Sequence, residues 1–291
     1  MLNLARFDYT DVILLCQGFC YNAICYHIKM GGHDMNGELY ELARLALYTK
    51  RSMKNGNENE YKLGEYVNRM IFSFLPSECS FLIKSDECTD TQSWYKALQK
   101  RAVKEIHLVI FFEEDNIKLA GFSNSAKQGL FTEYKDGKKT FWSAKWEFDN
   151  VSNSWTVYYK EFEWTGNSNL TFSFPECNKD FERALIDIEK LACKLGFDNF
   201  AYIFKDAYGI LTSKDAPLIS EWTKDPMLDL QGEKAKLFWA ASRADVFGGM
   251  GSWNDSPDCA AHEMGLQEDY DRLSHDLYIS IKRAVMNAVN C

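Results

Sequence analysis

The sequence predicts an α+β fold in which an antiparallel meander sheet is covered by helices, with helical regions at its N-terminal and C-terminal sides. Apolar residues recur at helical spacing over the first hundred residues, short β-rich runs follow, and helical spacing returns after Pro175. Strands grouped between helical regions are typical of α+β proteins. We therefore expect a helical N-terminal region over residues 1–100 and a second unit over residues 101–291, which holds the sheet, its covering helices and a C-terminal helical segment.

Composition limits the classes of function. A chain of 291 residues, 46% hydrophobic, can bury a sizeable core without disulfides or metal ions. Its nine cysteines are odd in number and irregularly spaced, and no secretory signal is recognisable, so we expect reduced thiols in a cytoplasmic protein. The net charge of −9 repels phosphate backbones and anionic lipids. We expect neither nucleic acid nor a membrane as a partner, and no cofactor.

Three helices are expected in the first region. Apolar spacing places them at Val12 to Met30, Gly37 to Met53 and Leu63 to Phe74, with a polar loop over Lys54 to Glu60. The first of these is interrupted by polar residues and is too short to span a bilayer, so it is expected to be buried. It carries cysteines and histidines without the close pairs of a zinc site, and these are expected to pack as small hydrophobic groups: Cys16, Cys20, Cys25, His27 and His33.

The middle region, from about Ile106 to Phe174, is expected to form the meander. Asp136-Gly137 predicts a hairpin turn, and Asp149 to Ser154 predicts a second, longer turn. Between them, aromatic and polar residues alternate, which predicts one buried and one wet face. The buried face is expected to include Trp142, Ala144, Trp146 and Phe148.

The third region returns to helical spacing. An apolar stripe from Phe181 to Leu195 stops at Gly196, a candidate C-terminal cap, and this helix is expected to cover the sheet. Covered in this way, the aromatic residues of the strands are expected to form a core, and the alternative is a stacking platform for sugars or bases. Two more helices are expected, one over Glu233 to Val246 and a long final one with its stripe from Tyr270 to Ala288.

Catalytic motifs begin in this chain but are not completed. His262-Glu263 starts like the zinc-protease motif H-E-x-x-H, yet Leu266 stands where the second histidine is needed. Ser274-His275-Asp276 is consecutive on a helix, so its side chains point about 100° apart and cannot form a triad. We assign no catalytic residue and no metal ligand. Cys259 and His262 remain the residues from which an unrecognised hydrolase site would be built.

The most informative segment is glycine-rich and lies between two predicted helices. Its glycines permit close backbone approach, either in a turn packed under Trp253 or in a nest of N–H groups that binds an anion. Acidic neighbours, among them Asp245 and Asp258, oppose the second interpretation. The candidate ligand- or partner-binding residues are Gly248, Gly249, Gly251, Trp253, Asn254, Asp255, Asp258 and His262.

The segment Val246 to Asp255, with the sequence VFGGMGSWND, resembles a C-terminal segment of uncharacterised bacterial proteins. The resemblance covers residues from Leu237 to Asn290 and transfers no catalytic residue. Some of these small intracellular proteins resemble toxin-neutralising immunity proteins, so the resemblance implies a bacterial protein that binds another protein.

Acidic residues gather in the same part of the chain. Between Asp245 and Ile281 there are eight carboxylates against the single cation Arg272, apart from histidines. Such a surface suits a basic protein partner, although an acidic face also serves solubility alone. Two functions remain. The first is a non-enzymatic binding protein of the immunity or inhibitor type that uses this acidic C-terminal surface. The alternative is a hydrolase with a site near the 248–263 loop.

Overall fold

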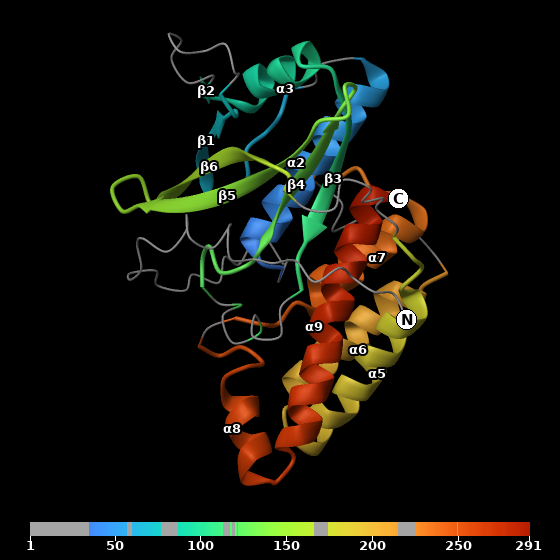
Figure 1. Cartoon of the computed structure of the whole chain (residues 1–291). Coiled ribbons are helices and arrows are strands. Elements are labelled where there is room, and N and C mark those ends of the chain that lie inside the picture. Colours follow the sequence, from blue (N-terminus) through green and yellow to red (C-terminus); the bar gives the residue numbers. More distant parts are fainter. Residues whose placement is uncertain are drawn as a thin grey trace.

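The computed structural model describes residues 35–56, 60–76, 87–112, 117, 120, 122–165, 174–214, 225–248 and 250–291. Over these residues the chain forms a sheet part and a helical part, joined along the last helix (Figure 1). The helices are α2 (Gly37–Asn55), α3 (Thr91–Lys100), α5 (Asn178–Lys194), α6 (Asp198–Thr212), α7 (Gly232–Ala244), α8 (Ser256–Glu263) and α9 (Gln267–Asn290). The strands are β1 (Val67–Ser73), β2 (Glu87–Cys88), β3 (Val103–Ile110), β4 (Gln128–Tyr134), β5 (Lys139–Asp149) and β6 (Ser154–Glu163).

The helix predicted at residues 12–30, with its cysteines and histidines, lies outside the described residues. In the described part of the chain, no helix has the length and apolar character needed to cross a membrane. Cys88, Cys177, Cys193, Cys259 and Cys291, which are described, are free thiols.

The sheet is mixed, which corrects the prediction of a purely antiparallel meander. Its strand order is β2-β1-β6-β5-β4-β3. The meander from β3 to β6 is antiparallel as predicted, but β1 pairs with β6 in parallel. The turn signals that predict a meander act only between consecutive strands. They carry no information on a strand from the first hundred residues that joins the sheet beside the last strand of the meander.

The same strand overturns the helix predicted over residues 63–74. Residues 67–73 form β1, in which Met70 and Phe72 enter the core and Arg69 is exposed. A short apolar run fits a helical and a strand period equally well. Val67, Ile71 and Phe72 favour a strand through their β-branched and aromatic side chains. Pairing with β2 on one edge and β6 on the other then favours the strand over the helix.

Both predicted turns are confirmed. Gly137 adopts a φ of 87° in the β4–β5 connection, which a side chain would strain. The second connection places Asn153 at a φ of 50° between β5 and β6. Along β5, Trp142 and Trp146 are buried whereas Lys145 is exposed, so the predicted alternation holds.

The helix that follows Pro175 is correctly located in the sequence but packs elsewhere. α5 ends as predicted at Gly196, which has a φ of 80°, and its stripe from Phe181 to Leu195 is buried. Its neighbours are α6 and α9, not the sheet. An apolar stripe shows that a face is buried but not against which surface. The core face of the sheet is instead contacted by α2 and α3, and Phe72 stacks between Trp94 and Tyr159 at centroid distances of 4.5 and 5.0 Å.

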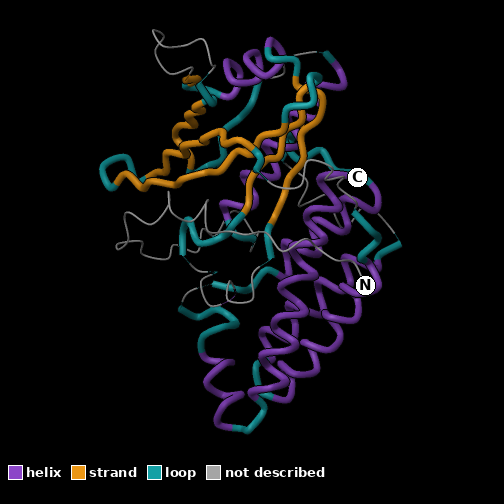
Figure 2. Tube along the Cα trace, in the orientation of Figure 1, coloured by secondary structure: helices purple, strands orange, loops and turns teal. Residues whose placement is uncertain are grey.

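The helical part is a ring of four packed helices in which α5, α6, α7 and α9 each contact two neighbours. Figure 2 shows these helices on one side of the molecule and the strands on the other. α9 runs from the far end of the bundle to β3, which it contacts, so it belongs to both parts. The short helix α8 precedes it at that far end (Figure 1).

Candidate functional site

Trp253 anchors the glycine-rich loop in the helical core. Its side chain is fully buried, stacks on Tyr270 at a centroid distance of 5.6 Å, and meets Phe200 and Phe204 edge-on. The indole Nε1–H donates a hydrogen bond to Ser274 Oγ at 2.8 Å, and Tyr270 donates one to the Trp253 carbonyl at 2.8 Å. These contacts favour the interpretation of the loop as a packed turn.

Side chains of the loop already occupy two of its backbone donors. Asn254 Oδ1 accepts a hydrogen bond from the Gly248 N–H at 2.8 Å, and Asp255 Oδ2 accepts one from the Gly251 N–H at 2.8 Å. Gly251 has a φ of 82°, a conformation that glycine adopts most readily. Gly249 lies outside the described residues. An external anion would have to displace the Asp255 carboxylate, so the loop is poorly suited to phosphate binding.

The other two predicted site residues lie on α8. Asp258 accepts a hydrogen bond from Gln267 Nε2 at 2.8 Å, which ties α8 to the first turn of α9. His262 and Cys259 are both exposed. Across the described residues, no hydrogen bond joins these two side chains, and no group of three or more histidine, cysteine or acidic side chains is arranged to hold a metal ion. The structure therefore brings five of the predicted residues into one turn and places Asp258 and His262 on the helix that follows.

Asp245 is buried and is not part of the acidic surface that was predicted from the sequence. Its side chain is 3% exposed, its Oδ2 lies 3.6 Å from Lys282 Nζ, and it accepts a hydrogen bond from the Asn36 N–H at 3.2 Å. It thus joins α7 to α9 and to the start of α2. This carboxylate serves the junction of the two parts and does not face a partner.

The remaining acidic residues gather at the far end of the bundle. We call residues 255–276, which include α8 and the first turns of α9, the acidic tip. They contain seven carboxylates and one cation, Arg272, which pairs with Asp269 at 2.8 Å. Five of the seven acidic residues are exposed: Glu263, Glu268, Asp269, Asp271 and Asp276.

Two exposed apolar side chains flank α8. Met250 is 95% exposed in the glycine-rich loop, and Met264 is 51% exposed directly after the helix. Methionine adapts its shape to different surfaces and is enriched where proteins contact partners. One exposed methionine thus lies within the acidic tip, and the other lies in the loop that leads into it.

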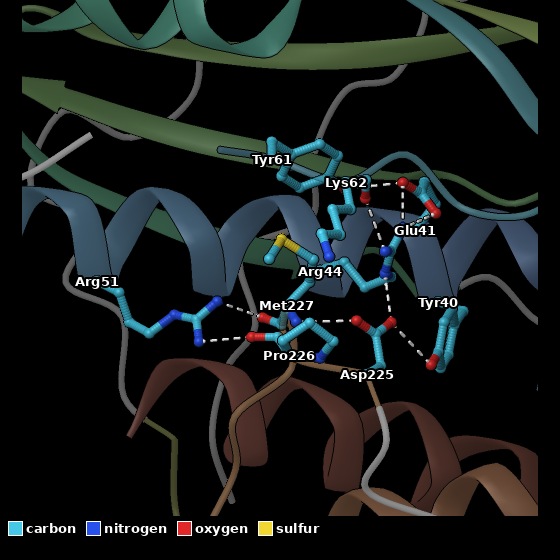
Figure 3. Close-up of polar contacts among 9 residues, drawn as sticks. All are labelled: Tyr40, Glu41, Arg44, Arg51, Tyr61, Lys62, Asp225, Pro226 and Met227. Atoms are coloured by element: carbon cyan, nitrogen blue, oxygen red, sulfur yellow. Dashed lines mark hydrogen bonds and ion pairs between the residues drawn. The ribbon is translucent and has the colours of Figure 1, made fainter. Parts of the chain in front are cut away.

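A buried ionic network in the sheet part was not predicted from the sequence (Figure 3). Arg44, 4% exposed on α2, lies between two carboxylates: Nη1 donates to both oxygens of Glu41 at 2.7 Å, and Nε donates to Asp225 at 2.5 Å. Its Nη2 donates to the Lys62 carbonyl at 2.8 Å, and Tyr61 donates to Glu41 at 2.7 Å. Burial raises the pKa of Glu41, while Arg44 and Tyr61 oppose that rise.

The network joins segments that are distant in sequence. Arg44 and Tyr40 hold Asp225 in the segment before α7, and Arg51, two turns along α2, donates to the carbonyls of Pro226 and Met227 at 2.8 Å. These partners engage all three nitrogens of the buried Arg44 guanidinium, so we assign the network a structural role. The only local signal was Glu41 and Arg44 at i and i+3, which normally indicates a surface pair.

A second buried carboxylate lies within the sheet. Glu161 is 1% exposed, and its Oε1 accepts hydrogen bonds from Tyr134 at 2.5 Å and Thr140 at 2.8 Å. Its Oε2 accepts one from the Leu75 N–H at 3.0 Å. The contacts tie β6 to β4, β5 and the end of β1, which again indicates a structural group.

In comparisons with known proteins, no family model, no curated protein and no solved structure matches this chain.

Proposed function

We propose that this protein is a non-enzymatic binding protein, of the immunity or inhibitor kind, that contacts a basic protein partner through the acidic tip. The observation that carries the proposal is the gathering of five exposed carboxylates, with one paired cation, on α8 and the start of α9. Charges of one sign on one surface accelerate encounter with a partner of opposite charge and exclude like-charged proteins.

Packing of α9 directs these charges outward. Tyr270, Ser274 and Leu277 face the core, whereas Glu268 and Asp276 are exposed. Residues three or four positions apart share a helix face, so the exposed carboxylates Glu268, Asp271 and Asp276 lie in one strip, which also holds Arg272 and His275. A basic segment lying along α9 could meet this strip without any rearrangement of the core.

The apolar flanks support contact with protein in preference to a general role in solubility. Met250 and Met264 are exposed, whereas most large apolar side chains of the described residues are buried. Acidic surfaces that carry methionines can bind the apolar face of a basic amphipathic helix. A basic amphipathic helix therefore matches the chemistry of the acidic tip.

The hydrolase alternative has weaker support. Cys259 and His262 share α8 at a spacing of three, but both face solvent, and we find no hydrogen bond among the described residues that orients the imidazole toward the thiol. A nucleophilic cysteine needs a base held in place by a third group. Hydrolytic activity that the wild-type protein shows and the Cys259→Ser variant lacks would support this alternative.

The proposal is tested with two charge variants of equal net charge. The tip variant combines Glu263→Gln, Glu268→Gln and Asp276→Asn, which are exposed and form no ion pair within the described part of the chain. The control combines three exposed carboxylates of the sheet part, Glu65→Gln, Glu87→Gln and Glu163→Gln. Each immobilised protein is first titrated with a synthetic basic amphipathic peptide and then used to capture native proteins, with binding measured over a range of salt concentrations.

We expect the tip variant to lose at least about tenfold in affinity while the control keeps most of its binding, because screened charges act over about 10 Å. Captured proteins should be basic and should be released by salt. Equal losses in both variants would indicate a nonspecific response to net charge and contradict the proposal. Failure of the wild-type protein to bind either probe would do the same.

A further inference from the structure

Two thiols meet at one side chain where α5 begins and α9 ends. Cys177 directly precedes α5 and is buried, and Cys291 directly follows α9 and is exposed. Asn287 lies between them: its Nδ2 contacts Cys177 Sγ at 3.3 Å, and its Oδ1 accepts from Cys291 Sγ at 3.4 Å. The two sulfur atoms are thus separated by one carboxamide group.

A second contact places Cys291 on the same segment. Its Sγ also lies 3.9 Å from the carbonyl of Phe174, three residues before Cys177. Cys193 and Cys259 are exposed, and neither has a sulfur contact of this kind in the part of the chain that the structure describes. The shared Asn287 side chain and the Phe174 carbonyl both place Cys291 close to Cys177, and Cys193 and Cys259 have no comparable contacts among the described residues.

We propose that Cys177 and Cys291 form a reversible disulfide when the protein meets a low-molecular-weight disulfide such as oxidised glutathione. The Cys291 thiolate attacks one sulfur of the oxidant, which forms a mixed disulfide and releases one thiolate. Cys177 then loses its proton to solvent and attacks Cys291 Sγ, which releases the second thiolate. In total two protein thiols are oxidised, one small disulfide is reduced to two thiols, and the Asn287 side chain moves out from between the sulfur atoms.

The two cysteines differ in a way that sets this order of steps. Burial raises the pKa of the Cys177 thiol to about 11, while Asn287 and Arg283 oppose the rise. A thiol that is mostly protonated at neutral pH is a poor first nucleophile, so the exposed Cys291 reacts first and Cys177 resolves the mixed disulfide. Ring closure should therefore accelerate as pH rises toward 11.

The bond would tie the C-terminal end of α9 to the entrance of α5. It closes a loop that contains the whole four-helix ring, and long closed loops restrict the unfolded chain strongly. The oxidised protein should therefore melt at a higher temperature than the reduced protein. Oxidation would fix the helical part in its native arrangement.

The test uses the full chain, first reduced and then exposed to oxidised glutathione. After acid quenching and alkylation of free thiols, peptide mass spectrometry locates each disulfide over time. We expect a Cys177–Cys291 linkage that forms about tenfold faster than any linkage to Cys193 or Cys259, because neighbouring thiols have a high effective concentration. Cys291→Ser, at an exposed position, should abolish it, and the matched exposed variant Cys193→Ser should not.

Asn287→Ala provides a readout that a purely structural role would not move. Removing the intervening carboxamide should speed ring closure several-fold relative to mixed-disulfide formation on Cys291 in the same variant, even though it also removes the Asn287 contact that lowers the pKa of Cys177. A mixed disulfide that persists on Cys291 would overturn the proposal, as would a preference of Cys291 for any other cysteine. An oxidised protein that carries the linkage but melts no higher than the reduced one would refute the stabilising role.

Discussion

The side-chain amide of Asn290 pairs with both backbone groups of Leu108, as a neighbouring strand would. Its Oδ1 accepts a hydrogen bond from the Leu108 N–H at 3.0 Å, and its Nδ2 donates to the Leu108 carbonyl at 2.8 Å. Lys50 donates to the same Oδ1 at 2.9 Å. Because β3 lies at the edge of the sheet that the described residues form, its outward backbone groups at Leu108 would otherwise offer a template for pairing with another chain.

Asn290→Ala should therefore destabilise the protein and promote its association. Two backbone groups lose their partners, which costs about 2 kcal/mol of unfolding free energy. Urea denaturation measures the loss, and light scattering at increasing protein concentration measures association. The control is Asn68→Ala, whose exposed side chain bonds only to Ser152, Ser154 and Thr156 among the described residues. Equal behaviour of the two variants would show that Asn290 does not protect the edge.

Gly64→Ala should disturb the Arg44 network. A Cβ at residue 64 would lie 2.4 Å from Glu41 Oε2 and 3.3 Å from Arg44 Nη1, and both side chains are held by their partners. We expect a loss of about 1–3 kcal/mol in unfolding free energy, as for overpacked cores. Gly209→Ala is the matched control, since a Cβ at residue 209 inside α6 would meet no described atom within 4 Å apart from the adjacent backbone of its own helix. That change should stabilise the helix by about 0.5–1 kcal/mol, and a Gly64 variant that behaves likewise would contradict the tight contact.

Two buried tyrosines should respond differently to loss of their hydroxyl groups. Tyr134→Phe removes a hydrogen bond to the buried Glu161 and should cost about 1.5–3 kcal/mol. Tyr159 is equally buried, but its hydroxyl has no hydrogen-bond partner in the described structure. Tyr159→Phe should therefore be neutral or stabilising by up to about 1 kcal/mol. Thermal and urea unfolding compare the two, and a large loss for Tyr159→Phe would reveal a partner for that hydroxyl.

Glu38 should make stability depend on pH near neutrality. Burial raises its pKa from 4.5 to about 7, against the opposing effects of the Asn124 N–H and Lys282. Between these two values the folded protein holds a proton that the unfolded chain releases, so the contribution of Glu38 to stability falls as pH rises and levels off above 7. Glu38→Gln should remove this slope, on the order of 2 kcal/mol between pH 4.5 and 7. Urea denaturation across this range measures it, with the exposed Glu65→Gln as control; parallel curves for wild type and Glu38→Gln would contradict the shift.

Periodic features were predictable from the sequence because they depend on neighbouring residues. The helix predicted from Gly37 to Met53 is α2, and the stripe that begins at Tyr270 follows α9. The turn at Asp136-Gly137 followed from its residue types. β1 did not, since its seven residues fit either period until β6 supplies a partner.

The candidate site shows the same division. Trp253 over the glycine-rich loop was foreseeable as a packed turn, because a large aromatic among glycines needs a core to enter. The Arg44 network was not foreseeable, since Asp225 lies 181 residues from Arg44. Asp245 was counted with the surface carboxylates because nothing near it in sequence shows that Lys282 will face it. Local pattern identifies faces, and only the fold identifies which faces meet.

α9 fixes how the sheet part and the helical part are rotated relative to each other about the helix axis. Tyr270 is held against Trp253 near one end, and Asn290 is bonded to Leu108 at the other. Each residue advances a helix by about 100°, so removing one residue between these anchors would turn Asn290 away from β3 if Tyr270 stays in place. The number of residues in α9 is therefore constrained more tightly than the identity of its solvent-facing residues. Only insertions that add close to a whole number of helical turns would keep both the Tyr270 and the Asn290 contacts.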